Sequence, residues 1–179
     1  MAANNFNNCL KVILHHEGGF VNHPKDPGGM TNLGVTKKVY EEWIGHKVSE
    51  QIMRKLTPSL VAPLYKKKYW DVLKCDGIPR GLDLCVFDFG VNAGTNRSAR
   101  YLQRMVGATE DGQIGPKTLI ALTKKTASEG VGSVIDQFQE ARRSYYKKLP
   151  TFATFGRGWL RRVDEVCTDA LLMTKANGK

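Results

Sequence analysis

Several features that would settle the class of this protein at once are missing from its sequence. No apolar run reaches the roughly 18 to 20 residues that a membrane-spanning helix needs, so we expect no stable insertion into a membrane. The first residues, Met1 to Asn5, have neither the basic segment nor the apolar core of a secretory signal. We therefore expect a soluble globular protein that is not exported by an ordinary signal.

Cysteine is scarce, with Cys9, Cys75, Cys85 and Cys167 as the whole set. No pair has Cys-x-x-Cys spacing and no histidine cluster accompanies them, so we expect no zinc site. Cys9 and Cys85 fall on apolar faces and are interpreted as core thiols, reduced where the protein is made. Nothing in the sequence indicates a metal, a cofactor or a cysteine nucleophile.

Acidic residues are outnumbered by basic ones. The 27 Lys and Arg against 17 Asp and Glu give a net charge of +10. Such a chain favours polyanions, which include nucleic acid, anionic lipid and bacterial envelope polymers. No helix-turn-helix, zinc-finger, RRM or KH motif appears, and acids such as Glu140 and Asp164 lie among the basic residues. We therefore expect no nucleic-acid partner, and an anionic cell wall suits the charge better.

The most informative stretch runs from Glu17 to Thr36. Apolar residues at helical spacing predict a helix from about Asn5 to Glu17, which Gly18 and Gly19 would end. Glu17 then lies in the last turn, where the negative end of the helix dipole favours a protonated carboxyl. A general acid that works near neutral pH needs that property, although a solvated glutamate at a fraying helix end gives the same pattern.

A loop rich in glycine and proline follows this glutamate. It holds four glycines and two prolines between residues 18 and 29, which suits tight turns or a small hairpin. Asp26 lies nine positions after Glu17 and could return across a cleft, as glycosidases need two carboxylates beside the sugar–sugar bond. Thr31 and Thr36 are candidates for holding a water or a substrate hydroxyl. The alternatives are an ordinary turn at Asp26 and a helix cap at Thr36.

This stretch resembles the signature of glycoside hydrolase family 108, the N-acetylmuramidases of phage endolysins and related bacterial proteins. The matching positions are Glu17, Gly18, Gly19, Phe20, Asn22, Pro24, Asp26, Pro27, Gly28, Gly29, Thr31, Gly34 and Thr36. The resemblance implies Glu17 as the catalytic acid, with a carboxylate pair and a threonine around a water as in phage-type lysozymes. His23 and Leu33 depart from the pattern, and His23 either makes the site pH-sensitive or lies on the loop surface.

Four residues are candidate substrate contacts. Phe20 and Asn22 belong to the signature, and Trp70 lies in a segment similar to the family's Tyr-x-x-x-Tyr-Trp-Asp. An aromatic ring at such spacing either stacks on a sugar or packs in the core. Asn92 ends a segment, from about residue 80 to 93, that is apolar nearly all round and predicts a helix in the middle of the fold. A buried Asp88 on that helix would need a partner, and Asn92 is either structural or faces the cleft.

The second half of the chain resembles helical peptidoglycan-binding modules. Its Asp-Gly-x-x-Gly-Pro-x-Thr turn spans residues 111–118, and residues 87–94 resemble the junction between the two parts of this family. We expect an irregular link over residues 149–158 and a last helix over about 159–175. The interpretation is a catalytic region at 1–94 and a helical peptidoglycan-binding-like region at 95–179, packed as one compact unit.

Together these observations predict a mostly α, lysozyme-like fold with two lobes, a cleft and a small loop or hairpin after Glu17. By resemblance, the protein is an endolysin that hydrolyses the β-1,4 bond between N-acetylmuramic acid and N-acetylglucosamine in peptidoglycan. Glu17 would protonate the leaving oxygen, and Asp26 would activate water or stabilise the transition state. A monomer is expected, held in the host cytoplasm until a holin releases it. The alternatives are a lytic transglycosylase, which needs no Asp26, and a non-catalytic wall-binding protein.

Overall fold

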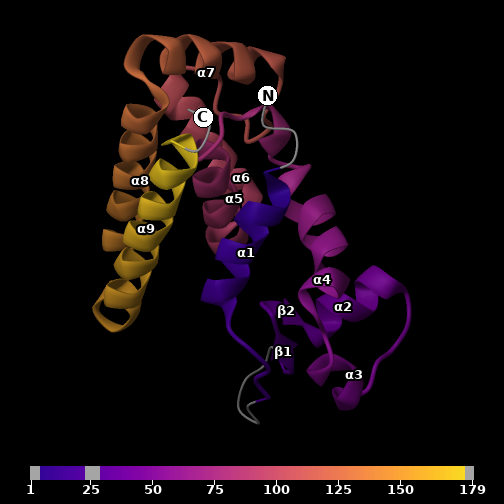
Figure 1. The fold of residues 1–179 in the computed structure, drawn as a ribbon. Helices are drawn as coiled ribbons and strands as arrows, with labels where there is room; N and C mark the ends of the chain where they lie inside the picture. The colour runs from indigo at the N-terminus through magenta and orange to yellow at the C-terminus, as the bar shows by residue number, and fades with distance from the viewer. Residues whose placement is uncertain (1–4, 23–28, 176–179) are drawn as a thin grey trace.

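The computed structural model describes residues 5–22 and 29–175, and the fold there is almost entirely helical, as predicted (Figure 1). The first part of the chain holds α1 (Phe6–Glu17), β1 (Thr31–Asn32), β2 (Val35–Thr36), α2 (Lys37–Ile44), α3 (Glu50–Arg54), α4 (Pro58–Tyr65), the π-helical turn η1 (Lys66–Trp70) and the 3₁₀ turn η2 (Cys75–Gly77). The second part holds α5 (Leu82–Ala93), α6 (Thr95–Val106), α7 (Pro116–Glu129), α8 (Val131–Lys147) and α9 (Phe152–Lys175). No described helix has the length and apolar character needed to cross a membrane.

A small antiparallel hairpin follows α1, as the glycine-rich sequence predicts. Gly18 ends the helix with a φ of +75°, a backbone conformation that glycine adopts without strain. Strands β1 and β2 pair Thr31 with Thr36, and the connecting Leu33 and Gly34 have φ values of +51° and +73°. Two positive φ angles in succession are typical of the tight turns that join antiparallel strands. The hairpin therefore turns back directly beside the end of α1.

The three short helices after the hairpin begin at capping hydroxyls. Thr36, Ser49 and Thr57 accept hydrogen bonds from backbone N–H groups in the first turns of α2, α3 and α4. Each bond satisfies a donor that the helix itself leaves free, so local sequence sets these boundaries. Pro63 lies inside α4, and the helix then widens into η1, where the Asp71 N–H donates to the Lys66 carbonyl at 2.9 Å.

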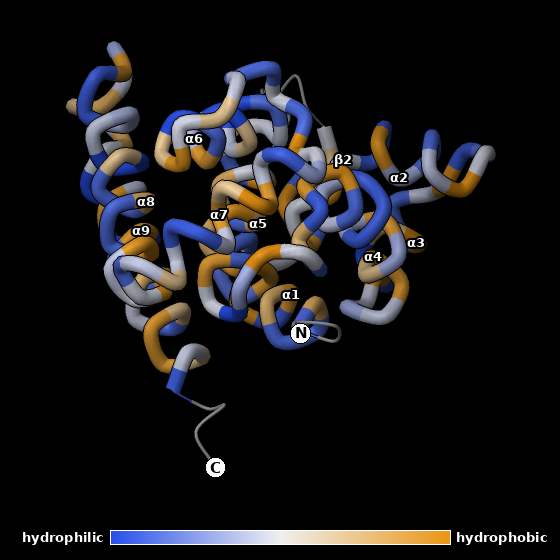
Figure 2. The backbone as a smooth tube through the Cα atoms, turned by 90° about the horizontal axis from the view of Figure 1, so that it is seen from above, coloured by the Kyte–Doolittle hydropathy of each residue, from blue (hydrophilic) through white to orange (hydrophobic). Residues whose placement is uncertain are grey.

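Helix α5 forms the centre of the molecule. Every residue from Leu82 to Gly90 is buried, which confirms the prediction of a central helix. It packs against α1, η1, η2, α6, α8 and α9. Figure 2 shows α8 and α9 on one side of α5 and α2, α3 and α4 on the other. Side chains from both halves of the chain therefore meet around α5.

The last helix is longer than predicted. It begins at Phe152, so the irregular link expected over residues 149–158 was wrong for most of its length. Gly156 looks like a helix breaker in the sequence, but here it is buried and the Phe152 ring packs over it. A side chain at that position would collide with the ring, so the glycine serves packing within the helix. Helix α9 runs beside α8 and reaches α1 (Figure 1).

Candidate active site

Glu17, in the last turn of α1, lies against the turn of the β1–β2 hairpin. A Cβ built on Gly34 would lie 2.9 Å from Cγ and Oε2 of Glu17 and 2.5 Å from the hydroxyl of Tyr65. The Tyr65 hydroxyl donates a hydrogen bond to the Leu33 carbonyl at 2.9 Å, which fixes the hairpin against α4. Only a glycine leaves room for the backbone to approach the carboxyl this closely.

Two phenols lie close to Glu17. The rings of Tyr65 and Tyr69 are 5.6 Å apart, on successive turns at the junction of α4 and η1. Burial raises the pKa of each phenol, and the nearby charge of Glu17 raises it further. Both hydroxyls therefore stay protonated at neutral pH and offer neutral hydrogen-bond groups on this side of the carboxyl.

Arg162 of α9 lies on the other side of Glu17. Its Nη2 donates to Glu17 Oε1 at 2.7 Å and to Asp88 Oδ1 at 2.8 Å. Burial works against the charge of Arg162, but the attraction of Asp88 and Glu17 outweighs it and raises the pKa of the guanidinium. The Glu17 side chain is 20% exposed and that of Arg162 13% exposed, so the pair is poorly screened by solvent and still open to a ligand.

Asp88 connects this pair to the interior. Its carboxyl is fully buried on α5 and also accepts from Arg142 Nη2 of α8 at 2.7 Å. Burial alone would raise the pKa of Asp88, but Arg142 and Arg162 together hold that pKa below its usual range. Tyr146 accepts from Arg142 and donates to Asn92 Oδ1, at the end of α5. A continuous polar network therefore runs from the carboxyl of Glu17 to Asn92.

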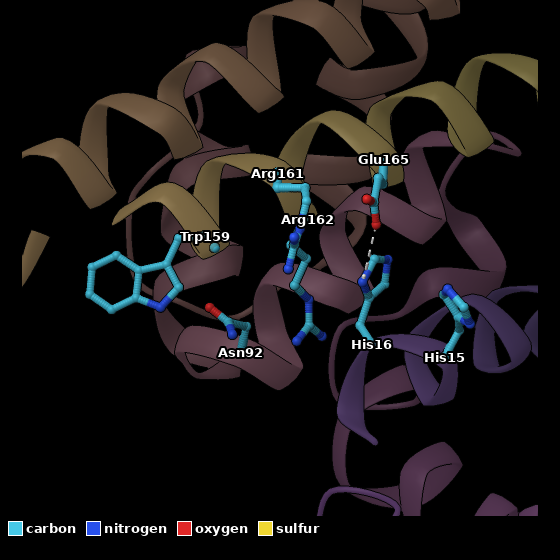
Figure 3. Close-up of a pocket in the computed structure, with 8 residues that line it drawn as sticks. His15, His16, Asn92, Trp159, Arg161, Arg162 and Glu165 are labelled. Atoms are coloured by element: carbon cyan, nitrogen blue, oxygen red, sulfur yellow. Dashed lines mark ion pairs between the residues drawn. The ribbon is translucent and has the colours of Figure 1, made fainter. Parts of the chain in front are cut away.

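An open pocket adjoins this network (Figure 3). It has a volume of about 530 Å³ and is lined by His15, His16, Asn92, Gly158, Trp159, Arg161, Arg162 and Glu165. His16 Nδ1 lies 3.6 Å from Glu165 Oε2. Burial lowers the pKa of His16 despite the nearby acids, so its ring is mainly neutral at pH 7. In Figure 3 Trp159 lies at one end of the pocket, and the histidines and Glu165 lie at the other.

The two candidate threonines lie opposite one another in the hairpin. Thr31 and Thr36 are directly paired across the strands, so their side chains share one face. The Thr36 hydroxyl accepts the Val39 N–H at 3.2 Å, and the helix-cap alternative is therefore present in the structure. Asp26, the predicted second carboxylate, and His23 lie outside the described residues.

Three of the other sequence candidates, Phe20, Asn22 and Asn92, lie in two different places. The guanidinium carbon of Arg54 lies 4.0 Å from the centre of the Phe20 ring, and Asn22 donates a hydrogen bond to Glu50 at 3.4 Å. Both residues therefore contact α3. Asn92 is exposed and lines the pocket of Figure 3, as its cleft-facing alternative requires. Phe20 and Asn22 therefore lie against α3, whereas Asn92 lies at the end of α5.

Trp70 is a core residue. Its side chain is fully buried, its ring packs edge-on against Phe6 and Phe87, and its Nε1 donates to Asp76 at 2.9 Å. The expectation that it stacks on a sugar is therefore corrected, because η1 turns the ring toward α1 and α5. The helical spacing in the sequence serves a core ring as well as an exposed one, so it could not distinguish the two.

Sequence reasoning missed the cations around Glu17. Arg162 and Arg142 come from helices that the sequence gave no reason to place beside α1. The one available signal was Asp88, because a carboxylate within an apolar helix requires a partner. In the described part of the chain, no group of three or more His, Cys, Asp or Glu side chains is arranged to hold a metal ion.

Comparisons with known proteins match nearly the whole chain. A family profile described as "Glycosyl hydrolase 108" matches residues 10–94, and one described as "Predicted Peptidoglycan domain" matches residues 97–164. The chain is similar to the structure of Brucella abortus SagA at 37% sequence identity and a TM-score of 0.83. That similarity covers 97% of this chain and 98% of the other. No curated protein matches the chain.

Proposed function

The chain belongs to glycosyl hydrolase family 108, and on this premise we propose that it hydrolyses the β-1,4 bond between N-acetylmuramic acid and N-acetylglucosamine. Family membership makes it a glycoside hydrolase, and the second matched region makes peptidoglycan its substrate. The bond that is cut and the biological setting are the proposed part.

The observation that carries the proposal is the position of Glu17. Its carboxyl is partly exposed and is held between the hairpin turn and Arg162. Because Oε1 accepts from Arg162, Oε2 is the oxygen left to carry a proton, and it faces Gly34 and the hairpin. A proton on Oε2 can pass to the glycosidic oxygen as the sugar–oxygen bond breaks.

Charge balance around the acid shows what a second carboxylate would add. The transition state of glycoside hydrolysis carries positive charge on the sugar, which an uncompensated arginine would oppose. Asp88 is shared by Arg162 and Arg142, so an ionised Glu17 completes a balance of two cations and two anions. Once Glu17 is protonated to act as the acid, one positive charge is left over, and the proposed role of Asp26 is to offset it at the sugar.

The second catalytic group is proposed from the sequence. Asp26 would activate the attacking water or stabilise the cationic sugar, as the resemblance implies. Thr31 and Thr36 share one face of the hairpin, so one water could contact both hydroxyls. The biological setting we propose is host lysis: the enzyme stays in the host cytoplasm until a holin releases it to the wall. Its net charge of +10 favours the anionic wall polymers.

The test is mass spectrometry of soluble products from purified peptidoglycan. Wild type should release new reducing-end N-acetylmuramic acid, and Glu17→Gln should not. Glu42→Gln, the same change at an exposed position on α2, is the matched control and should retain activity. Asp26→Asn should also lose activity if that residue handles water.

Other products would identify other activities. Anhydro-muramic acid ends that survive Asp26→Asn would indicate a lytic transglycosylase, and reducing-end N-acetylglucosamine would indicate cleavage of the other bond. If wild type releases no product but sediments with peptidoglycan, the chain is a wall-binding protein. Each of these outcomes would contradict the proposed reaction.

A further inference from the structure

The pocket of Figure 3 shares one side chain with the catalytic acid. Arg162 lines the pocket, and its Nη2 is 2.7 Å from Glu17 Oε1. A ligand in this pocket would therefore lie one guanidinium away from the carboxyl. Its lining comes from the ends of α1 and α5 and from residues 158–165 of α9, so segments far apart in the chain build it.

One end of the pocket offers an aromatic surface. Trp159 is half-buried and stacks on the buried ring of Tyr146, with ring centres 5.3 Å apart and an angle of 28° between the planes. Tyr146 is fixed in turn by Arg142 and Asn92. Phe155, which is 55% exposed, lies 5.8 Å from Trp159 on the same helix. The indole is thus held rigidly with part of its surface free, which suits an apolar sugar face.

The charges in the pocket single out Arg161. Arg162 is already paired with Asp88 and Glu17, and burial keeps His16 mainly neutral beside Glu165. Arg161 is exposed and has no ion pair with any described residue. A guanidinium with free donors binds a carboxylate through two parallel hydrogen bonds. Glu165 at the far end disfavours a ligand with many negative charges.

We propose that this pocket is a substrate subsite for a carboxylate-bearing saccharide of the glycan strand. Trp159 would contact the sugar ring. Arg161 would bind a free carboxylate of the peptide that the lactyl group of the muramic acid carries. This inference rests on the proposed function, because it takes peptidoglycan as the substrate. It gives α9 a role in choosing which saccharide lies beside Glu17.

The chain offers a matched control for the arginine. Arg157 lies four positions before Arg161 on α9, is exposed, and does not line the pocket. Arg161→Gln and Arg157→Gln therefore remove the same charge from the same helix. The probe is a set of soluble glycan fragments, used unmodified or with their carboxylates converted to neutral amides.

Arg161→Gln should raise KM at least about tenfold on the unmodified fragments, because it removes two charge-assisted hydrogen bonds to the carboxylate. On amidated fragments its KM should equal that of wild type. Arg157→Gln should change KM less than about twofold on either substrate. Trp159→Leu should raise KM on both substrates with kcat nearly unchanged, and Trp159→Phe should recover part of the loss. Thermal unfolding of each variant shows whether the fold is kept.

Equal KM values for Arg161→Gln and Arg157→Gln would overturn the proposal, as would a loss that persists on amidated fragments. Binding to the Glu17→Gln protein separates this inference from the proposed function. Titration of the same fragments into Glu17→Gln and into Glu17→Gln with Arg161→Gln requires no catalysis. Tighter binding by the former supports the subsite even if wild type releases no product, and equal binding overturns it.

Discussion

Glu17 and Arg162 are 145 positions apart in the chain, yet Glu17 Oε1 and Arg162 Nη2 are 2.7 Å apart. The pair joins α1, the first described helix, to α9, the last one, and Arg162 also contacts Asp88 in the middle of α5. Through Arg162, the geometry of the acid depends on how α9 packs against α1 and α5.

Arg162→Gln should lower both activity and stability. It leaves Glu17 without its partner and the buried Asp88 with only Arg142, so we expect a loss of about 2 to 4 kcal/mol in the free energy of unfolding. Arg162→Lys should keep the charge but bridge the two carboxylates poorly. Its activity and its free energy of unfolding should therefore lie between those of Arg162→Gln and wild type. Urea unfolding and product release measure the two effects.

The control for that prediction is Arg143→Gln. Arg143 pairs with Asp164 at 2.6 Å, but the Asp164 side chain is 63% exposed. Its loss should cost less than about 1 kcal/mol. If both variants lose the same stability, the buried pair contributes no more than a surface pair.

Gly34→Ala should inactivate the enzyme more than it destabilises it. The new methyl would collide with Tyr65 and Glu17, and it would place a side chain at a φ of +73°. Gly45→Ala meets the same backbone strain at a φ of +84° but has no atom within 4 Å of the new carbon. The control should therefore lose about 1 to 2 kcal/mol of stability and keep its activity. Equal activity in the two variants would show that Gly34 does not constrain Glu17.

Two buried aspartates on α5 should respond to pH in opposite ways. The pKa of Asp88 is lowered, because the two arginines outweigh burial, so its contribution to stability is present above its unfolded pKa near 3.8 and is lost as pH falls further. The pKa of Asp83 is raised, chiefly by burial. Between the unfolded pKa near 3.8 and the higher folded pKa, Asp83 is therefore protonated in the folded protein and ionised in the unfolded chain. The Asp83 contribution therefore falls as pH rises above about 4.

Asn substitutions test this contrast directly. Asp88→Asn should lose about 3 to 5 kcal/mol at pH 7 and less at pH 3, because the fully buried Arg142 is left without a charge partner and Arg162 keeps only Glu17. Asp83→Asn keeps Oδ1 for the Gly81 and Leu84 N–H groups, but its new NH₂ would face Asn5 Nδ2, which donates to Asp83 Oδ2 at 2.8 Å, so it should lose about 1 to 2 kcal/mol at pH 7. Urea unfolding between pH 3 and 7 measures both slopes. Parallel slopes for the two variants would contradict the assignment.

Tyr65→Phe should loosen the hairpin with little change elsewhere. It removes one hydrogen bond, to the Leu33 carbonyl at 2.9 Å, and should cost about 1 kcal/mol. Because the same hydroxyl lies beside Glu17, kcat should fall as well. Tyr40→Phe is a useful control, since Tyr40 is a buried tyrosine on α2. Comparable kcat values in the two variants would exclude a role for the Tyr65 hydroxyl at the acid.

Local features of the sequence predicted most of the fold. The helix cap given as the alternative at Thr36, the turn after Gly18 and the central apolar helix all depend on residues close together in the chain, and the structure shows all three. The start of α9 was mispredicted because glycine normally weakens a helix. At Gly156 the packing of Phe152 offsets that weakness, and no local pattern shows it.

The candidate site was predictable only in part. Glu17 follows from a short motif, but its partner Arg162 comes from a distant helix, and charge spacing in a sequence does not report such pairs. Trp70 shows the converse, because a motif containing an aromatic residue does not say which way the ring faces. A buried charged group predicted a distant contact better than the motifs did. The sequence showed that a buried Asp88 requires a partner, although it did not show which residue that partner is.

The bridge from α9 to Glu17 also bears on engineering. A fragment cut after residue 94 would keep the acid and the hairpin but would lose Arg162 and Arg142. Asp88 would then be buried without a counter-charge, or the end of α5 would open to water. A chimaera that joins residues 1–94 to another wall-binding domain would inherit the same defect. Residues 1–94 should therefore not be transferable to another domain on their own, unless that domain places an arginine beside Asp88 and Glu17.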